Sequence, residues 1–556
     1  MGEQPMAEAP SPADRERPIE PSLFSPLRHR MFMAVWLTNT LSNFGFQIQS
    51  VGAAWAMTLM AGSPKLVGLV VTAQLLPMVL LSLVFGAVAD VFDRRRVLLV
   101  AQLIRMAAAA ALAAIAFAGL LTPALLLLLT FLLGCGLALN SPAAQAVVGD
   151  LVPLADVPAA VTLNSMGFNL ARTLAPAVGG VVVAAAGAQA AFLVNALCYI
   201  ALLVVLVRWR RPPAEPTVAR ESIWSATGGG LRYVVHAHGV GRIVARAALC
   251  GCAMAALTAL LPLVVKEQLR ADSALYGVML GCAGVGAVSG GFARVWLRAR
   301  LSGEGVLQLA QAMIVAALLI TALSHWAPLT GLAQLLYGAG MFLSLNSFTV
   351  TMQLSVPRWV VGRAMAVVSM GNMGGFALGG WLWGTLAESA GVVATQQVAA
   401  LLLVGAMLLG RRLPLLDPDP ELHRPSSRRL PSRFTFAERD GSLPVAVQRE
   451  FRIAADRHEA FLALMRERRR MRLRQGVRQW TLAQDVSEPE LWIERYHLSS
   501  WDDLRRSAER MTIEEERNLD EIVRLHVGEE RPPVRFLIER DVAQRAPPTV
   551  RPEEGF

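Results

Sequence analysis

Long apolar runs and short polar gaps alternate along the first three quarters of the chain. Each run has 21 residues or more, and about 20 apolar residues suffice for a helix to cross the hydrocarbon core of a membrane. The runs are 32–60, 66–89, 97–119, 123–147, 159–186, 189–209, 242–265, 274–299, 303–325, 328–352, 361–386 and 390–412. The pattern predicts an all-α membrane protein with twelve transmembrane helices.

The pattern changes after residue 413. Prolines crowd residues 414–435, which predicts a linker. Beyond it, shorter stretches alternate between the two-residue period of strands and the longer period of helices. The predicted strands are 444–452, 476–485, 490–498 and 533–540, and the predicted helices are 455–473, 500–509 and 512–526. Their order is that of a ferredoxin-like domain, so residues 436–545 are expected to form a small soluble cytoplasmic α+β domain.

The apolar part of the chain repeats itself at an offset of 204 residues. Six pairs share this offset: Gly86 and Gly290, Gly134 and Gly338, Gly136 and Gly340, Pro153 and Pro357, Ser165 and Ser369, Gly167 and Gly371. Repeated membrane-embedded halves are typical of transporters, which rock about a central site. We therefore expect two six-helix repeats, 31–209 and 242–413, joined by a cytoplasmic central loop, 210–241.

Composition agrees with a membrane protein that has a soluble tail. Hydrophobic residues make up 54% of the chain and charged residues 17%, against about 25% charged residues in soluble domains. The net charge of +10 comes mostly from arginines beside the spans, so a basic rim facing lipid headgroups is favoured over nucleic-acid binding. The five cysteines fall within predicted spans without metal-ligand spacing, so inert thiols and no metal site are expected.

Arginines flank every second connection between the spans. They are Arg28, Arg30, Arg94–Arg96, Arg208, Arg210, Arg211, Arg298, Arg300, Arg358, Arg363, Arg411 and Arg412. The other connections are nearly neutral, with Lys65 and Lys266 among their few bases. The positive-inside rule therefore predicts that both termini lie in the cytoplasm. Residues 1–30 are Pro-rich and charged without an apolar core, so a disordered N-terminus and no cleavable signal peptide are expected.

A charged loop joins the second and third spans, with the sequence Gly86-Ala-Val-Ala-Asp90-Val-Phe-Asp93-Arg94-Arg95-Arg96. It resembles the signature loop of the major facilitator superfamily, Gly-x-Leu-Ala-Asp-Arg-x-Gly-Arg-Arg. It departs from that pattern at Val91, where a base is usual, and at Asp93, where glycine is usual. A degenerate copy lies at the repeat offset, from Gly290 to Arg300.

This resemblance implies the major facilitator fold and a role for the loop. In that superfamily the aspartate is thought to bind the cytoplasmic end of the eleventh span in the outward-facing state. Asp90 would then cap the helix N-terminus near Gly362–Ala364, where free amides and the helix dipole favour an anion. Gly86, Asp90, Arg94 and Arg95 are thus expected to act as a conformational latch, not as substrate ligands.

The fifth span carries a second motif, from Asn169 to Gly180. It resembles the antiporter motif of drug-exporting members of the superfamily at Pro176, Gly179 and Gly180, although Ala175 replaces the usual first glycine. Proline and glycine would bend this helix and let it pack tightly where the halves meet.

Arg172 stands in the same motif, about three turns inside the span. An arginine inside a membrane span is a functional candidate, because its charge needs a partner or a water-filled cavity. The alternative is an arginine that extends along the helix toward lipid headgroups. Both interpretations stay open at this stage.

Amide side chains suggest a polar pathway. Asn39, Asn43 and Gln47 are spaced by four residues and lie near one face of the first span. Together with Arg172, Asn346 and Asn372 they are the candidates for the substrate cavity, although an isolated amide is more simply explained as a hydrogen-bonding group between helices. The middle of each span lacks a carboxylate, so the group that would carry a coupling proton is unresolved, with Asp150 and Asp90 as candidates.

The tail raises the question of enzymatic activity. Its pattern resembles the small antibiotic-biosynthesis monooxygenase domains, which pair into dimeric α+β barrels. Its aromatic and histidine residues form no catalytic motif, so an aromatic core in a regulatory or dimerising domain is favoured over an enzyme. Those residues are Trp480, Trp492, Tyr496, His497, Trp501 and His526.

Taken together, the spans, the two motifs and the tail resemble the transmembrane secretion effectors, a bacterial branch related to the enterobactin exporter and macrolide efflux proteins. The resemblance implies a proton-coupled exporter of siderophore-like or drug-like amphipathic molecules in the bacterial inner membrane. No catalytic residue and no cofactor are expected. An importer of the same fold, a membrane-anchored enzyme and self-association through the tail remain as alternatives.

Overall fold

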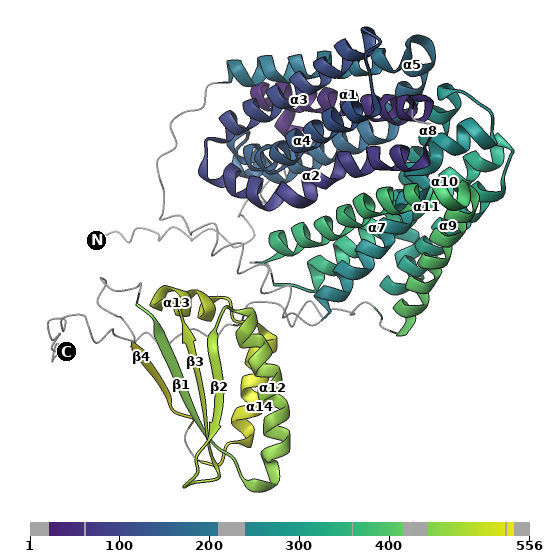
Figure 1. The fold of residues 1–556 in the computed structure, drawn as a ribbon. Helices are drawn as coiled ribbons and strands as arrows, with labels where there is room; N and C mark the ends of the chain where they lie inside the picture. The colour runs from purple at the N-terminus through teal and green to yellow at the C-terminus, as the bar shows by residue number, and fades with distance from the viewer. Residues whose placement is uncertain are drawn as a thin grey trace, which may run out of the picture.

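The computed structural model describes residues 22–60, 63–209, 239–357, 360–412, 443–528 and 531–538, with Pro414 and Ser426 (Figure 1). Most of the predicted N-terminal segment 1–30, central loop 210–241 and linker 414–435 lies outside these ranges. The described residues form a large helical bundle and a smaller α+β domain.

Hydrophobic runs become the helices of the bundle because a helix satisfies its own backbone hydrogen bonds in lipid. The N-terminal half contains a short 3-10 turn η2 (Ser25–Arg28), α1 (Arg30–Met60), α2 (Pro64–Val91), α3 (Arg94–Phe117), α4 (Pro123–Leu151), η3 (Leu154–Asp156) and α5 (Val157–Arg208). The C-terminal half contains α7 (Val240–Leu263), a π-helical turn η4 (Val264–Gln268), α8 (Ser273–Arg298), α9 (Gly303–Leu323), α10 (Ala327–Leu354) and α11 (Val361–Arg412). Polar residues in the gaps cap several of them: the Asp93 side chain accepts from the Arg96 amide at the start of α3, and Ser302 from the Gly305 amide at the start of α9.

Nine helices in the described part of the chain are long and apolar enough to cross a membrane. Helix α1, which carries several amides, is not among them, whereas α5 and α11 each comprise two helical segments. Gly187 divides α5 with φ 78° and ψ 171°, and Gly391 divides α11 with φ 82° and ψ 163°. Dividing these helices gives twelve helical segments, which match the twelve predicted runs in position. That all twelve cross the membrane stays a prediction.

The two dividing glycines confirm the repeat. Gly187 and Gly391 are 204 residues apart, and the limits of α5 and α11 differ by the same 204 residues at both ends. Helix packing repeats as well: α1 packs on α5 as α7 packs on α11, and α2 packs on α4 as α8 packs on α10. The halves meet along two equivalent pairs, α5 with α8 and α2 with α11.

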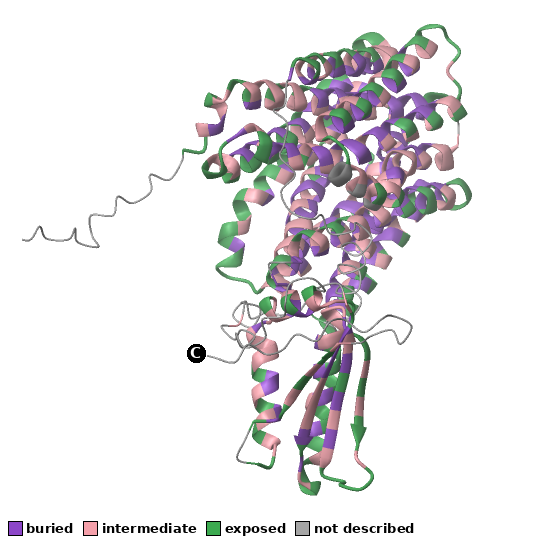
Figure 2. Ribbon diagram, turned by 90° about the vertical axis from the view of Figure 1, so that its left-hand side faces the viewer, coloured by how far each residue is buried: buried purple, intermediate pink, exposed green. Residues whose placement is uncertain are grey.

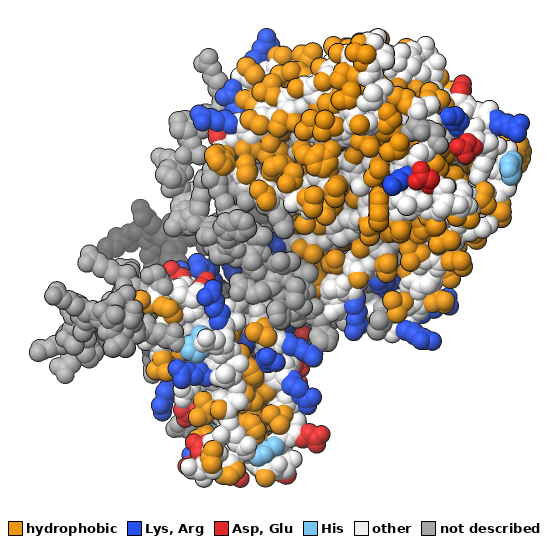
Figure 3. Space-filling model, in the orientation of Figure 1, with side chains coloured by type: hydrophobic (Ala, Val, Ile, Leu, Met, Phe, Trp, Pro, Cys, Tyr) orange, Lys and Arg blue, Asp and Glu red, His pale blue; other side chains and the backbone are white. Residues whose placement is uncertain are grey.

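Buried residues line the interior of the bundle, and the outer surface is largely apolar (Figures 2 and 3). Large exposed side chains such as Leu80, Val181, Phe292 and Leu401 contribute to this surface. In water such an area would promote aggregation, so it is the surface expected to face lipid acyl chains. Charged side chains gather near the ends of the helices (Figure 3).

The C-terminal domain is a four-stranded antiparallel sheet with helices on one face (Figure 1). Its elements are β1 (Val445–Arg452), η5 (Ala455–Arg457), α12 (His458–Arg474), β2 (Arg478–Gln484), β3 (Leu491–Leu498), α13 (Trp501–Glu509), α14 (Ile513–Leu525) and β4 (Val534–Ile538). The strand order β2-β3-β1-β4 is that of a ferredoxin-like sheet, so the predicted α+β domain is confirmed.

Candidate functional site between the two halves

The halves touch closely at one end of the bundle. We call the end that carries Arg94–Arg96 the basic end, and the other the opposite end. At the opposite end the Lys266 ammonium donates to the Thr58 carbonyl over 2.8 Å, so η4 contacts the last turn of α1. The Ser63 hydroxyl donates to Glu388 over 2.8 Å. These contacts join the N-terminal half to the C-terminal half.

Between the opposite end and the middle of the bundle, glycines allow the backbones of the halves to approach one another. A β-carbon on Gly180 of α5 would lie 2.3 Å from the Cα atom of Gly277 on α8. A β-carbon on Gly68 of α2 would lie 2.2 Å from the Gly380 carbonyl of α11. Either substitution would force the halves apart, because atoms do not pack at such distances. The span-5 glycine Gly180 therefore lies at the junction of the halves.

Toward the basic end, the named contacts between the halves among the described residues extend to Val79 on α2 and Arg172 on α5. A β-carbon on Gly86 of α2 or on Gly362 of α11 would meet none of the described residues within 4 Å. In the described part of the bundle, the closest contacts between the halves thus lie toward the opposite end.

Arg172 reaches across the junction at the last of these contacts toward the basic end. Its guanidinium donates from Nη2 to the sulfur of Met341 on α10, over 3.0 Å. One turn earlier on α10, the Tyr337 hydroxyl lies 2.8 Å from the hydroxyl of Thr258 on α7. The arginine of the N-terminal half thus points toward the C-terminal half, as the pathway interpretation requires. A thioether is only a weak acceptor, so most of the donors of this guanidinium stay available.

The predicted amide candidates are dispersed. Asn39 lines a pocket inside the N-terminal half together with Asn140 and Asn164. Asn43, Gln47 and Asn346 are partly exposed.

Asn372 does not face the pathway in this structure. Its side chain is buried within the C-terminal half, where it donates to the Ala247 carbonyl of α7 over 3.2 Å. For this residue the simpler explanation, a hydrogen bond between helices, is the one that the structure shows.

The arginines of the loop motif are occupied within their own half. Arg94 donates to the Ala146 carbonyl over 3.1 Å and to Asp150 over 3.3 Å on α4. Arg95 donates to the carbonyls of Leu206 and Val207 at the end of α5. These bonds fix the start of α3. The backbone of Asp90 belongs to the last turn of α2, and its side chain is outside the described part of the molecule.

Sequence reasoning missed an arginine in the middle of α3. Arg105 is 0% exposed, and its Nε, Nη1 and Nη2 atoms all lack hydrogen-bond partners among the described residues. The ring of Tyr199 lies 4.4 Å from its Cζ atom, and that of Phe46 lies 5.6 Å away. Arg172 was selected because it is an arginine within a predicted span. The same criterion would have selected Arg105, which lies within the predicted run 97–119.

A buried ion pair in the C-terminal half was also missed. Arg246 of α7 donates two hydrogen bonds to the carboxylate of Glu304 on α9, over 2.6 and 2.8 Å. The Arg246 side chain is 7% exposed. Each residue lies near the start of its helix, so the sequence alone suggested only ordinary end charges.

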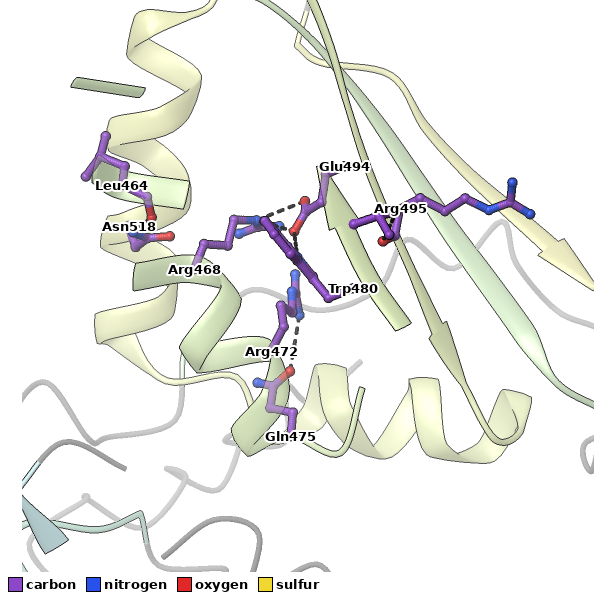
Figure 4. Close-up of polar contacts among 9 residues, drawn as sticks. Leu464, Arg468, Arg472, Gln475, Trp480, Glu494, Arg495 and Asn518 are labelled. Carbon is purple, nitrogen blue, oxygen red and sulfur yellow. Dashed lines mark hydrogen bonds and ion pairs between the residues drawn. The ribbon is translucent and has the colours of Figure 1, made fainter. Parts of the chain in front are cut away.

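The interior of the C-terminal domain is filled by charged and aromatic side chains (Figure 4). Glu494 of β3 is fully buried and accepts from Arg468 over 2.8 and 2.9 Å and from the Trp480 indole over 3.0 Å. Burial alone would raise the pKa of Glu494, but the charges of Arg468, Arg472 and Arg449 outweigh it and hold the pKa below its ordinary value.

Aromatic packing completes this interior. Phe461 of α12 lies against Phe451 of β1, and both contact the cluster that includes Trp492. Four residues of α12, His458, Phe461, Leu462 and Met465, form an apolar stripe in the sequence, but Leu462 is 37% exposed, because the buried face follows Phe461, Met465 and Arg468. The layer between the sheet and helices is therefore a packed core.

Family comparison agrees with this architecture. The profile of the transmembrane secretion effector family matches residues 21–544. This chain belongs to that family. The match takes in both the helical bundle and the α+β domain.

Individual relatives of this secretion effector are transporters. Over 404 residues it is 26% identical to the multidrug efflux pump Tap of Mycobacterium tuberculosis, covering 68% of this chain and 94% of that one. It is 27% identical to the enterobactin exporter EntS of Shigella boydii, covering 68% and 91%. The staphyloferrin A transporter of Staphylococcus aureus is 30% identical over 164 residues, which cover 29% of this chain and 41% of that protein.

Solved structures of transporters share the fold of the bundle. A bacterial homologue of the human lysosomal transporter Spinster superposes with a TM-score of 0.57 at 16% identity, covering 69% of this chain and 97% of that one. The nucleoside transporter NupG superposes with a TM-score of 0.57 at 13% identity, covering 69% and 98%. The secretion effector is thus a multi-pass membrane protein of the major facilitator fold.

Proposed function

We propose that this secretion effector is a proton-coupled exporter of siderophore-like or drug-like small molecules that works by alternating access. The observation that carries the proposal is a bundle of two equivalent halves whose closest described contacts lie toward the opposite end, with Arg172 reaching from one half to the other. The relatives named as an efflux pump and as an exporter support outward transport.

We infer a state that is open at the basic end, and the positive-inside rule sets its direction. The basic end then faces the cytoplasm, as do both termini and the C-terminal domain. A bundle open to the cytoplasm is the state in which an exporter takes up its cargo. Amphipathic molecules would enter between the halves and meet Arg172 at the level where the halves close.

The loop motif would stabilise the opposite state. When the basic end closes, Asp90 at the end of α2 can cap the first turn of α11 near Gly362–Ala364, where unpaired amides attract an anion. Arg94 and Arg95 hold α3 in place and keep the loop in position. Among the described residues, nothing lies within 4 Å of where a β-carbon on Gly362 would be.

Proton coupling requires a titratable group, and Asp150 is the candidate with a defined partner. It lies 3.3 Å from Arg94 between α3 and α4. A proton on Asp150 would remove the negative charge that holds Arg94 and loosen that contact at the basic end. Asp90 is the second candidate, because a protonated carboxyl is a poor helix cap.

The C-terminal domain is proposed to regulate the bundle or to pair with a second copy. The sheet face away from α12 and α14 carries Gln448, Arg495, His497 and Leu537, and Leu537 is 41% exposed. Light scattering of the purified full chain before and after Leu537→Asp tests this: a dimer that becomes a monomer supports pairing, and a monomer in both cases contradicts it.

Transport itself is tested in everted membrane vesicles with a labelled siderophore. Accumulation inside the vesicles that depends on a proton gradient, and that stops when an ionophore collapses the gradient, supports coupled export. Accumulation that persists without the gradient contradicts coupling. Release of preloaded cargo from the vesicles instead of uptake would mean that the chain is an importer.

A further inference from the structure

Charges in the middle of the bundle are few and of one sign. Among the described helices, only Arg105 and Arg172 are charged residues more than ten positions from both ends of their helical segment. Both belong to the N-terminal half. Other charges, including Lys65, Glu304 and Glu388, lie near helix ends or beside the break at Gly391.

Neither arginine is neutralised by the protein around it. No carboxylate is named beside Arg105 in the described part of the chain: the rings of Tyr199 and Phe46 lie near its guanidinium, and the Tyr199 hydroxyl is close to it. Arg172 has the Met341 sulfur as its named partner. Arg246, by contrast, is buried with a carboxylate bonded to it twice. In the described part of the bundle, Arg246 therefore has a carboxylate partner, whereas Arg105 and Arg172 have none.

The site of Arg105 is built for this side chain. A β-carbon on Gly136 of α4 would lie 2.4 Å from the Arg105 Cγ atom, so a glycine makes room for its stem. The hydroxyl of Tyr199 and the side chain of Asn195 lie nearby, and both are uncharged. An unpaired charge in this setting is costly, because the low dielectric of the membrane interior does not screen it. The cost suggests a functional reason for keeping it.

We propose that the pathway selects anionic small molecules, with Arg172 as the residue that contacts the anion and Arg105 as a buried positive charge that acts at a distance. This rests on the proposed transport function. Two unpaired positive charges at mid-depth attract an anion and repel a cation, and the described interior offers no carboxylate to offset them. Arg105 has no exposed surface, so it acts through its electric field and not through contact.

Binding of two related dyes of opposite charge tests the proposal. Anionic carboxyfluorescein and cationic rhodamine 6G are titrated separately into the purified full chain in detergent, and fluorescence anisotropy is measured. The wild-type chain is expected to bind the anion at least about tenfold more tightly. Equal affinity, preference for the cation, or binding of neither dye contradicts the proposal.

Variants separate the two roles. Arg172→Gln should lose most of the preference, and Arg172→Lys should rescue it poorly, because a point charge does not replace a planar fork of donors. Arg105→Met should lower anion affinity by a few fold and leave the melting temperature unchanged or higher, since an apolar side chain of similar length removes a buried charge. Arg242→Gln, at the exposed start of α7, is the matched control and should change nothing.

A purely structural Arg105 gives a different result. In that case Arg105→Met lowers the melting temperature and leaves the dye preference intact, which would remove Arg105 from the proposal. The measurement needs neither a proton gradient nor a transport direction. Anion-selective binding without uptake by everted vesicles would therefore contradict the exporter while leaving this inference standing.

Discussion

The two halves of the bundle share their helix order and their broken helices, but they treat buried charge differently. At the offset of 204 residues, Arg105 corresponds to Leu309 and Arg172 to Phe376, whereas Arg246 corresponds to Ser42. Among the described residues, the mid-depth arginines of the N-terminal half have no carboxylate partner, whereas the C-terminal half pairs its buried arginine with Glu304. The repeat thus supplies the architecture, and the differences between the copies supply the chemistry.

The largest expected effect comes from blocking the contact that the halves share. Gly180→Leu places a bulky side chain where a β-carbon would already lie 2.3 Å from the Gly277 Cα atom. Overpacking costs about 1–3 kcal/mol or more, here against the state closed at the opposite end, so vesicle transport should be abolished. A cysteine introduced at the opposite end should become permanently accessible to a membrane-impermeant thiol reagent.

Gly405→Leu in α11 is the control for this change, because a β-carbon at Gly405 has open space. Gly384, the equivalent of Gly180 at the repeat offset, would place a β-carbon 3.0 Å from the Pro64 carbonyl. Gly384→Leu should therefore impair transport less than Gly180→Leu. Equal loss of transport in the two variants would show that the contacts at Gly180 and at Gly384 are equally important for closing the opposite end.

A second prediction tests the difference in charge pairing directly. Arg246→Met leaves the Glu304 carboxylate without its partner, and breaking a buried pair costs about 3–5 kcal/mol. Arg105→Met removes an unpaired charge and should cost nothing. The melting temperature of the purified chain should therefore fall sharply for Arg246→Met but not for Arg105→Met. The double variant Arg246→Met with Glu304→Leu should recover much of the lost stability. A larger fall in melting temperature for Arg105→Met than for Arg246→Met would contradict this difference between the halves.

A third prediction extends charge pairing to the C-terminal domain. Folding lowers the pKa of the Glu494 carboxyl, so this group stabilises the folded domain at pH values above its unfolded pKa of about 4.3. The stabilisation is lost as the pH falls through the lower pKa of the folded state. Peptides from β3 and α12 in the full chain should lose protection from hydrogen exchange below about pH 4. Glu494→Gln should be less stable at neutral pH, by about 3 kcal/mol, and less sensitive to acid. Unchanged protection of the variant at pH 7 would contradict the role of this pair.

The smallest effect is expected from removing the C-terminal domain. Deletion of residues 436–556 should leave a folded bundle, since the halves carry their own packing and hydrogen bonds. Size-exclusion chromatography in detergent should show a single sharp species with the melting temperature of the full-length bundle. Aggregation of the truncated protein would mean that the two halves depend on the domain for their fold.

The sequence predicts the fold well because the governing signals are local. A membrane span needs a run of apolar residues, and the predicted run 123–147 lies within α4 (Pro123–Leu151). The gap predicted between 186 and 189 falls at Gly187, although nothing in the sequence indicated a joint as short as one residue. In the tail, the aromatic residues were expected to form a core, and the structure shows Trp492 and Tyr496 buried there.

The candidate site was less predictable because it depends on which helix faces which. An amide on one helix can point into its own half or into the pathway, and spacing along that helix does not distinguish them. Asn372 illustrates this limit, since its partner Ala247 is 125 residues away in the chain. The pairing of Arg246 with Glu304 is invisible for the same reason, because it joins the starts of two separate helices.

The glycine joints at Gly187 and Gly391 have a mechanical consequence. Because only one residue separates the two segments of α5, and likewise those of α11, the segments of each pair cannot move far relative to one another. In the proposed transport cycle, a tilt of the segment of α5 before Gly187 would therefore move the segment from residue 188 to 208 with it. Each half would then rotate as one rigid body, and a motion at the contact between the halves would reach the outer helices.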